Sequence, residues 1–146
     1  MPVRTSQAVW KGTLKEGSGT LRTQSGAYEG PYNFVSRFES GPQTNPEELV
    51  AAAHAACYSM ALSGGLERAG FKATRIATKA SVHLEKVDSG FAITHIDLDV
   101  EADVPGVDEK KFAEVSEATK SGCPISKLLT GAKINLSARL LSGTAA

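Results

Sequence analysis

The chain has 146 residues, of which 41% are hydrophobic, and this size and composition predict one globular domain over residues 1–146. Its 16 basic and 16 acidic residues give zero net charge, so we expect no nucleic-acid-binding surface. Two cysteines, Cys57 and Cys123, are too few for a disulfide framework, and residues 1–7 lack the apolar run of a signal peptide. We therefore expect a soluble cytoplasmic domain, in which the role of two isolated cysteines is the open question.

The first forty residues are rich in Gly, Ser and Thr, which predicts short strands joined by turns. Residues 8–10 and 20–23 are the first two candidate strands. Residues 32–38 alternate between an aromatic-rich face and a face that carries Arg37, so we predict a third strand there.

A helix is predicted to follow, beginning at Asn45-Pro46-Glu47-Glu48. Asn45 is a favoured N-cap, Pro46 suits the first helical position, and Glu48 has the spacing of a capping-box acid. We expect the helix to run to about residue 69 and to stop at Gly70.

This predicted helix is apolar on every side, because His54, Tyr58 and Ser59 are the polar residues between positions 49 and 62. A small domain has few ways to cover such a helix, so we expect a sheet, a partner chain or both to bury it. We do not expect it to cross a membrane, since its apolar run is shorter and more interrupted than the ~20 residues that a span needs.

The second half of the chain alternates in a way that is typical of strands. Residues 76–84 and 91–101 are predicted to form a hairpin, with a bulge near Thr94 where the phase of the alternation slips. A helix over 109–120 capped by Asp108, a short helix over 124–129 and a last strand over 133–140 are expected to follow. This order predicts an α+β fold with mostly antiparallel pairing.

The two cysteines differ in their expected chemistry. Cys57 lies in the apolar helix, where a free cysteine most often only packs. Cys123 precedes Pro124 at a helix start, where free N–H groups and the helix dipole favour a thiolate. The two do not form a dithiol motif in the sequence, so any pairing between them must come from the fold.

His54 lies three residues before Cys57, on the same face of the predicted helix. This spacing leaves two kinds of site open: a Cys–His nucleophile pair of a hydrolase, or two ligands of a metal site with Cys123 as the third. Because neither motif is complete, we favour a third interpretation, a core or interface histidine that is hydrogen-bonded to the backbone.

Arg37 and Glu47 belong to no motif that spacing alone would reveal. Glu47 is free because Glu48 serves the cap, and an acid in the first turn favours the helix dipole. Arg37 is expected to be a solvated charge on its strand.

Residues 45–57, Asn-Pro-Glu-Glu-Leu-Val-Ala-Ala-Ala-His-Ala-Ala-Cys, resemble the central-helix signature of the osmotically inducible protein C / organic hydroperoxide resistance (OsmC/Ohr) family. Residues 122–126, Gly-Cys-Pro-Ile-Ser, resemble its second signature, and residues 32–39 resemble the strand that bears the family arginine. The resemblance extends in order along nearly the whole chain and is closer to the OsmC branch. It implies an OsmC-like α+β fold, in which antiparallel sheets wrap a buried central helix within an intertwined homodimer.

The resemblance also implies a function: a cysteine-based, metal-free peroxidase that reduces organic hydroperoxides to alcohols in oxidative or osmotic stress defence. Cys57 matches the peroxidatic cysteine and Cys123 the resolving cysteine, which pair in a disulfide during each cycle. Arg37 matches the arginine that holds the thiolate and the peroxide oxygen, and Glu47 matches the acid that positions this arginine. A lipoyl-carrying protein or a small dithiol is the implied reductant, and no metal, bound cofactor, membrane or nucleic acid is expected to take part.

Helix geometry adds an inference about the dimer. If Glu47 and Cys57 share one helix, they lie ~15 Å apart along its axis and roughly 80° apart around it. One arginine bridges such a separation poorly within a chain, so we expect Arg37, Glu47 or both to act on Cys57 of a partner chain. Two other functions stay open: a non-catalytic structural or binding domain with idle thiols, and a Cys–His hydrolase built on His54 and Cys57.

Overall fold

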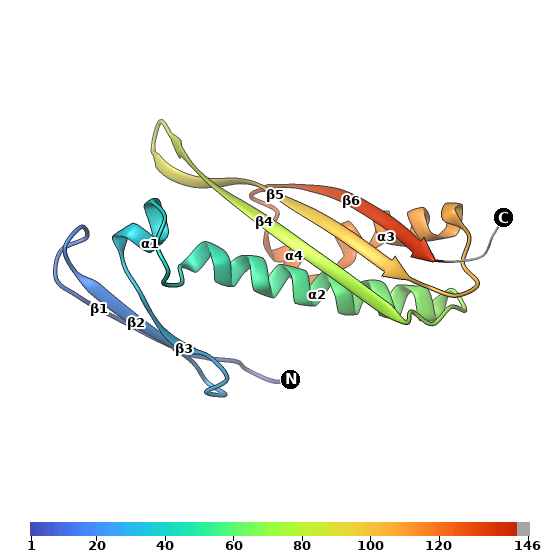
Figure 1. Cartoon of the computed structure of the whole chain (residues 1–146), viewed down its shortest axis with the longest axis horizontal. Coiled ribbons are helices and arrows are strands. Elements are labelled where there is room, and N and C mark those ends of the chain that lie inside the picture. Colours follow the sequence, from blue (N-terminus) through green and yellow to red (C-terminus); the bar gives the residue numbers. More distant parts are fainter. Residues whose placement is uncertain (143–146) are drawn as a thin grey trace. The chain divides into compact units, whose positions relative to one another are not determined.

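The computed structural model describes residues 1–142 and contains two sheets and four helices in that range (Figure 1). The α+β class predicted from the sequence is therefore confirmed. The chain divides into two compact units, the first over Met1–Leu49 and the second from Val50 onward, and the expected single domain stays a prediction. In chain order the elements are β1 (Ser6–Lys11), β2 (Ser18–Thr23), β3 (Glu29–Tyr32), α1 (Phe34–Phe38), α2 (Pro46–Arg68), β4 (Arg75–Val87), β5 (Gly90–Asp103), α3 (Glu109–Gly122), α4 (Pro124–Leu128) and β6 (Lys133–Ser142).

The first unit is built on an antiparallel sheet in the order β1-β2-β3, as the short alternating segments predicted. Gly19, on β2, lies between two aromatic rings: a Cβ there would come within 2.6 Å of both Trp10 and Tyr32. The absence of a side chain at this position lets those two rings pack together, with centroids 5.4 Å apart.

The strand predicted over residues 32–38 is wrong beyond Tyr32, because residues 34–38 form the helix α1. Asn33 caps this helix: its side chain accepts a hydrogen bond from the Ser36 N–H at 2.8 Å, and the Ser36 hydroxyl accepts one from the Asn33 N–H at 3.0 Å. Phe34 and Phe38 lie one turn apart and their rings pack at a tilt, with centroids 4.9 Å apart. An aromatic pair at this spacing fits one face of a helix as well as one face of a strand, so the cap decides between them.

The helix α2 begins as predicted and differs in one detail of its cap. The Glu48 N–H donates to the Asn45 side chain at 2.7 Å, which confirms Asn45 as the N-cap. The Glu48 carboxylate accepts instead from the Thr44 hydroxyl at 3.2 Å, so no capping box closes. At the other end Gly70 has a φ of +96°, and the Phe71 N–H bonds back to the Leu66 carbonyl at 2.9 Å, which is the expected glycine stop.

Burial on every side of α2 is not what this chain shows. His54, Tyr58, Leu62 and Leu66 recur every four residues and form one buried face. The opposite face is apolar yet exposed, and its Met60 side chain is 78% exposed. A single chain covers one face of α2, so the opposite face is available to a binding partner.

The length argument against a membrane span is also wrong. Among residues 1–142, α2 is long and apolar enough to cross a membrane when length and composition alone are considered, with 23 residues and a mean hydropathy of 1.3. The core helix of a soluble protein passes the same test, and the buried face of α2 packs into the core of the second unit.

In the second unit α2 lies along the sheet β4-β5-β6 (Figure 1), in which β4 pairs antiparallel and β6 parallel with β5. His83 pairs with His95 and Leu84 with Ile93, so Thr94 is the extra residue of a bulge, as predicted. The sheet and helices share one core: Tyr58, Leu62, Leu66, Ile96, Leu98, Val100, Ala102, Val104, Val107 and Phe112.

The helices α3 and α4 meet at Cys123. Asp108 caps α3 as predicted, since its carboxylate accepts from the Lys111 N–H at 2.7 Å. Cys123 ends α3 and is also the N-cap of α4, whose first residue is Pro124. Pro124 therefore turns the chain into a new helix at the cysteine.

Candidate functional site

The fold brings the two cysteines of the chain together. Both are free thiols, and their Sγ atoms lie 2.8 Å apart, within hydrogen-bond contact. This separation is longer than the ~2.05 Å of a disulfide bond and needs little motion to become one. The fold thus supplies the pairing that the sequence spacing left open.

Each thiol is held by a different part of the second unit. Cys57 lies in the middle of α2 and is partly exposed. Cys123 is fully buried, and both of its backbone polar groups are bonded: its N–H to the Thr119 carbonyl and its carbonyl to the Lys127 N–H, each at 3.0 Å. The two thiols thus differ in exposure: Cys57 is open to solvent in part, and Cys123 is closed to it.

The pKa values of the two thiols are shifted in opposite directions. Burial raises the pKa of Cys57, and the contact with the Cys123 thiol raises it further. Burial also works against ionisation of Cys123, but its interactions with the Cys57 thiol and with Ser126 outweigh burial, so the pKa of Cys123 is lowered. Cys123 is therefore the more acidic thiol of the pair, which agrees with the acidity expected at a helix start.

His54 bonds to neither cysteine. Its Nε2 lies 2.8 Å from the Ser126 hydroxyl, and both side chains are buried. Burial lowers the pKa of His54, so the ring is neutral at neutral pH. The structure thus gives His54 a hydrogen bond to a side chain, where the sequence favoured one to the backbone.

Arg37 and Glu47 form an ion pair in the first unit. Arg37 donates from Nε at 3.2 Å and from one terminal nitrogen at 3.1 Å, and both bonds reach the same Glu47 oxygen, Oε1. The Glu47 side chain is 10% exposed and the Arg37 side chain 40%. Arg37 lies on α1 and not on a strand, so the expected solvated strand charge is in fact a paired charge on a short capped helix.

The four residues predicted for the site thus fall into two pairs, one in each compact unit. Their catalytic roles stay predictions.

A hollow of about 190 Å³ adjoins Arg37 within the first unit. Its lining is largely aromatic and consists of Trp10, Leu14, Tyr32, Asn33, Phe34, Arg37 and Phe38. The sequence analysis did not predict this hollow, although five of the chain's nine aromatic residues lie between positions 10 and 38, the stretch that also holds Arg37.

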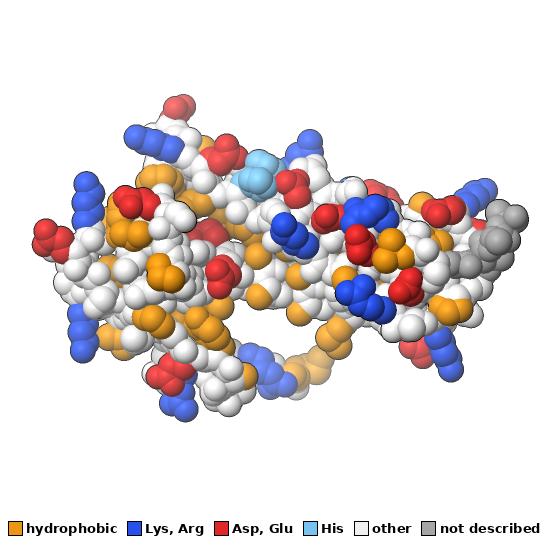
Figure 2. Space-filling model, viewed as in Figure 1, with side chains coloured by type: hydrophobic (Ala, Val, Ile, Leu, Met, Phe, Trp, Pro, Cys, Tyr) orange, Lys and Arg blue, Asp and Glu red, His pale blue; other side chains and the backbone are white. Residues whose placement is uncertain are grey.

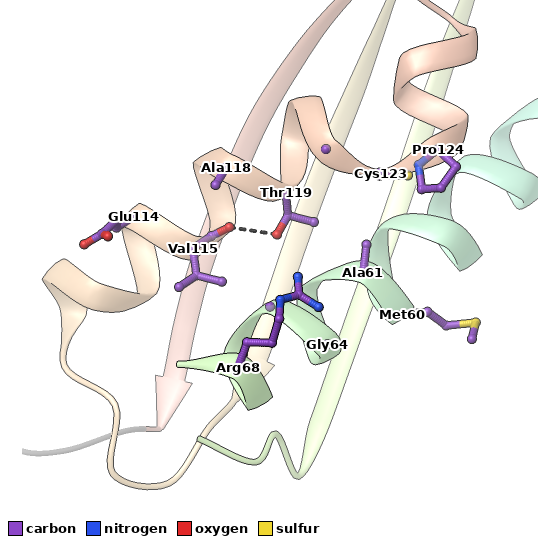
Figure 3. Close-up of a pocket in the computed structure, with 12 residues that line it drawn as sticks. Met60, Ala61, Gly64, Arg68, Glu114, Val115, Ala118, Thr119, Cys123 and Pro124 are labelled. Carbon is purple, nitrogen blue, oxygen red and sulfur yellow. Dashed lines mark hydrogen bonds between the residues drawn. The ribbon is translucent and has the colours of Figure 1, made fainter. Parts of the chain in front are cut away.

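A second hollow, of about 490 Å³, separates α2 from α3 in the second unit (Figure 3). Cys123 and Pro124 lie at one end, and Arg68 reaches from α2 toward α3 near the other. The helices approach closely at Gly65, where a Cβ would come within 3.0 Å of Val115.

A third feature that the sequence did not reveal is a group of His83, His95 and Asp97, whose ligand atoms lie within 4.8 Å of one another. The bulge at Thr94 brings the two histidines opposite each other, and their rings stack with centroids 3.9 Å apart. His83 Nε2 lies 2.9 Å from the Asp97 carboxylate. In Figure 2 histidine side chains lie beside acidic ones on the surface.

Comparison with known proteins identifies the family. The model of OsmC-like proteins matches residues 39–137, a stretch that includes Glu47 and both cysteines. The chain belongs to the OsmC-like protein family.

Similarity to members of the OsmC-like family extends along most of the chain. It is 52% identical over 137 residues to the Escherichia coli protein "Peroxiredoxin OsmC", covering 93% of this chain and 95% of that protein. A Mycoplasma pneumoniae protein named "Organic hydroperoxide resistance protein-like" is 35% identical over 88 residues, or 60% of this chain and 61% of that protein. The resemblance seen in the sequence is thereby confirmed.

Solved structures agree on the OsmC-like fold. An OsmC-like protein from Mycoplasma pneumoniae superposes with a TM-score of 0.74 at 18% identity, covering 95% of this chain and 97% of that one. The organic hydroperoxide resistance protein OhrB of Bacillus subtilis has a TM-score of 0.68 at 23% identity, covering 92% and 97%. At these identities the likeness concerns the fold.

Proposed function

We propose that this OsmC-like protein is a thiol-dependent peroxidase that reduces organic hydroperoxides to alcohols. The observation that carries the proposal is the pair of free thiols 2.8 Å apart, one partly exposed and one buried. The name of the 52% identical relative, a peroxiredoxin, supports the same chemistry.

The proposed cycle uses the thiols in turn. The Cys57 thiolate attacks the peroxide oxygen and breaks the O–O bond, which leaves Cys57 as a sulfenic acid and releases an alkoxide that takes up a proton. The Cys123 thiol then displaces the sulfenic hydroxyl, which forms the Cys57–Cys123 disulfide and one water. An external dithiol returns two electrons and two protons and becomes a disulfide itself.

The first step needs a Cys57 thiolate, whereas burial and the contact with Cys123 raise the pKa of Cys57. A guanidinium placed against the Cys57 sulfur opposes this rise and also stabilises the departing alkoxide. Arg37 is the residue proposed for this role. Glu47 holds it by one carboxylate oxygen, which leaves the other terminal guanidinium nitrogen for a ligand.

The aromatic hollow beside Arg37 supports an organic peroxide as substrate. Its walls are largely rings and leucine, which favour an apolar tail, while the arginine favours an oxygen that gains charge. Hydrogen peroxide has no tail to bury there, so an alkyl or aryl hydroperoxide is the better fit.

The exposed apolar face of α2 supports a homodimer, because a second chain would cover Met60 and the alanines beside it. We further propose that Arg37 and Glu47 act on the Cys57 of the partner chain. α2 is one continuous helix from Pro46 to Arg68, so Glu47 and Cys57 lie nearly three turns apart along it. An Arg37 held by Glu47 therefore reaches the Cys57 of its own chain poorly.

The remaining parts of the proposal concern the cell. Two free thiols that must be reduced again in every cycle suit a cytoplasmic protein, where thiol reductants are maintained. A lipoyl-carrying protein or a small dithiol is the proposed reductant, and defence against oxidative or osmotic stress is the proposed role.

Intact mass tests the reaction. Addition of one equivalent of cumene hydroperoxide to the reduced protein is expected to remove two hydrogens, and Cys57→Ser or Cys123→Ser is expected to abolish that loss. Cys123→Ser should gain one oxygen instead, because its sulfenic acid has no resolving thiol. An unchanged mass in the folded wild-type protein would refute the peroxidase.

The same preparation separates the other two functions. A Cys–His hydrolase would cleave an ester, would depend on His54 and would not need Cys123. A structural domain with idle thiols would show neither reaction.

Subunit mixing tests the partner-chain site. A Cys57→Ser chain keeps Arg37 and Glu47, while an Arg37→Ala, Glu47→Ala chain keeps both cysteines. If the site is shared between chains, freshly formed mixed dimers recover one working site, although neither parent is active. No recovery in verified mixed dimers would contradict the shared site.

A further inference from the structure

Two histidines and an aspartate gather on the outer face of the sheet β4-β5-β6. His83 on β4 is in register with His95 on β5, and the ligand atoms of these two rings and of Asp97 lie within 4.8 Å of one another. Residues alternate between the two faces of a strand, and Ile96, between His95 and Asp97, is buried in the core that α2 shares. The group therefore lies on the face of the sheet that is turned away from α2.

The hydrogen bonds around His95 determine which of its ring nitrogens can bind a metal. The hydroxyl of Thr94, the bulge residue, donates its one proton to the Glu85 carboxylate. The same hydroxyl lies 2.9 Å from His95 Nδ1, and it has no proton left to give, so it accepts from Nδ1–H. The Glu85 carboxylate also lies 3.4 Å from that Nδ1. In the neutral ring the lone pair is then on Nε2, which is the nitrogen that a metal takes.

Asp97 and His83 are oriented in a comparable way. Asn135 on β6 donates to Asp97 Oδ1 at 2.9 Å, which leaves Oδ2 for another partner. Without a metal that partner is His83, whose Nε2 lies 2.9 Å from Oδ2. Two ligands of one zinc ion are ~3.3 Å apart, because Zn–N and Zn–O bonds are about 2.0–2.2 Å long. An ion that replaces the proton between these two atoms therefore needs them to separate only slightly.

Outer contacts of this kind are typical of metal sites. A ligating histidine usually donates its other N–H to an oxygen acceptor, and a ligating carboxylate usually accepts a hydrogen bond of its own. Thr94 and Glu85 provide the first contact, and Asn135 provides the second. The local charge also favours a cation, because the two carboxylates of Glu85 and Asp97 outnumber Lys133, the one cation in register with the histidines.

We propose that His83, His95 and Asp97 bind a divalent metal ion of the zinc class, at a site separate from the two thiols. Two imidazole nitrogens and one carboxylate oxygen suit Zn²⁺ and its neighbours Co²⁺, Ni²⁺ and Cu²⁺, whereas Mg²⁺ and Ca²⁺ prefer oxygen ligands alone. The ion takes no part in the proposed peroxidase reaction. Its ligands come from both β4 and β5, so it joins the two strands at the bulge.

The three side chains can adjust to an ion. They are between 33% and 47% exposed, so the ion enters from solvent and water completes its coordination. The two rings are stacked with an angle of 11° between their planes, and parallel rings do not point at one ion. One ring must therefore turn when the metal binds, and its partial exposure leaves room for that rotation.

The histidine rings of the reduced, metal-free protein provide the first test. In NMR spectra of the ring nitrogens, saturating Zn²⁺ is expected to shift the signals of His83 and His95. Mg²⁺ in excess is expected to shift neither signal. Unchanged His83 and His95 signals at saturating Zn²⁺ would overturn the inference. No step of this test uses peroxide, so its result is independent of the proposed peroxidase.

Calorimetry measures the affinity and the stoichiometry. The titration uses a Cys57→Ser, Cys123→Ser protein, because thiolates are zinc ligands themselves. One Zn²⁺ per chain is expected, and adding His83→Ala or His95→Ala to that protein is expected to abolish binding. Far-ultraviolet circular dichroism identifies the variants that remain folded. Zinc affinity that persists in the folded His83→Ala and His95→Ala proteins would also contradict the site.

Two further variants distinguish a built site from a general attraction of cations to carboxylates. Asn135→Ala keeps all three ligands and removes the contact that orients Asp97, so it is expected to weaken zinc binding about tenfold. Asp99→Asn is the matched control, because Asp99 lies two residues farther along the same strand face and pairs with Arg139. It removes the same charge as Asp97→Asn would and is expected to leave the zinc affinity unchanged. Equal weakening by Asp99→Asn and Asp97→Asn would show that only the surface charge matters.

Discussion

The chemistry of single residues centres on where one negative charge resides. Burial and the neighbouring thiol raise the pKa of Cys57, while interactions with Cys57 and with residues at the start of α4 lower the pKa of Cys123. A peroxidatic role for Cys57 therefore requires an outside cation. Arg37, held by Glu47 beside an aromatic hollow, is the residue we expect to provide it.

Arg37→Ala is expected to slow sulfenic acid formation at pH 7 about 100-fold, the usual effect of losing one preorganised charged donor. Because the pKa of Cys57 is raised without the arginine, more thiolate forms as the pH rises, and the rate of the variant should recover at alkaline pH. Stopped-flow oxidation of Cys57 between about pH 6 and 10 measures this. Lys79→Ala, an exposed cation on β4, is the control, and equal rates for Arg37→Ala and wild type would contradict the role.

At the scale of elements, the packing of α2 against α3 depends on which of two adjacent glycines meets the neighbouring helix. A Cβ on Gly65 would lie 3.0 Å from Val115, whereas one on Gly64 would meet only the flexible end of Arg68, at 3.5 Å. Both glycines lie inside α2, where alanine is favoured over glycine by about 0.5–1 kcal/mol.

Gly64→Ala is therefore expected to raise the free energy of unfolding by about 0.5–1 kcal/mol. Gly65→Ala should gain less or lose stability, because its methyl group must displace Val115. Urea unfolding of both variants, each also combined with Val115→Ala, tests this. The added mutation should relieve the penalty at position 65 only; equal effects at both positions would show that the contact is not restrictive.

The β4–β5 bulge creates a second effect at this scale, on the carboxylate of Asp97. Hydrogen bonds from Asn135 and His83 lower the pKa of Asp97. A carboxyl whose pKa is lower in the folded state stabilises the protein above its unfolded pKa and loses that contribution as the pH falls through its folded pKa.

Asp97→Asn is thus expected to lower the urea midpoint at pH 7 and to differ progressively less from wild type below about pH 4. Asp88→Asn, in the turn after β4, is the control and should show no such convergence. A gap between Asp97→Asn and wild type that stays constant from neutral to acid pH would contradict the assignment.

For the whole molecule, the decisive feature is the helix α2, which is buried on one face and apolar yet exposed on the other. A surface of this kind is costly in water and suits a second copy of the chain.

Met60→Glu is expected to convert the proposed dimer to a monomer, because it places a charge in the centre of that face. Light scattering during size-exclusion chromatography measures the mass. Lys79→Glu, on the outer side of β4, should leave the dimer intact. A Met60→Glu protein that stays dimeric would remove this face from the interface.

Much of the fold follows from local chemistry that a sequence carries. The Asn45 and Asp108 caps, the Gly70 stop and the bulge at Thr94 were all predictable, because each depends on residues within one turn or one strand pair. The same kind of reasoning failed at residues 34–38, where the aromatic spacing suited strand and helix alike and the bonds between Asn33 and Ser36 decided for a helix.

The sequence by itself also determined the types of residue at the site: two thiols, one of them at a helix start that favours its ionised form. Only the tertiary structure decided that Cys57 meets Cys123, that Arg37 meets Glu47, and that His54 bonds to Ser126 and not to a cysteine. These contacts join residues up to 72 positions apart. Their partners are set by how helices and strands pack, and local propensity carries no information about distances of that kind.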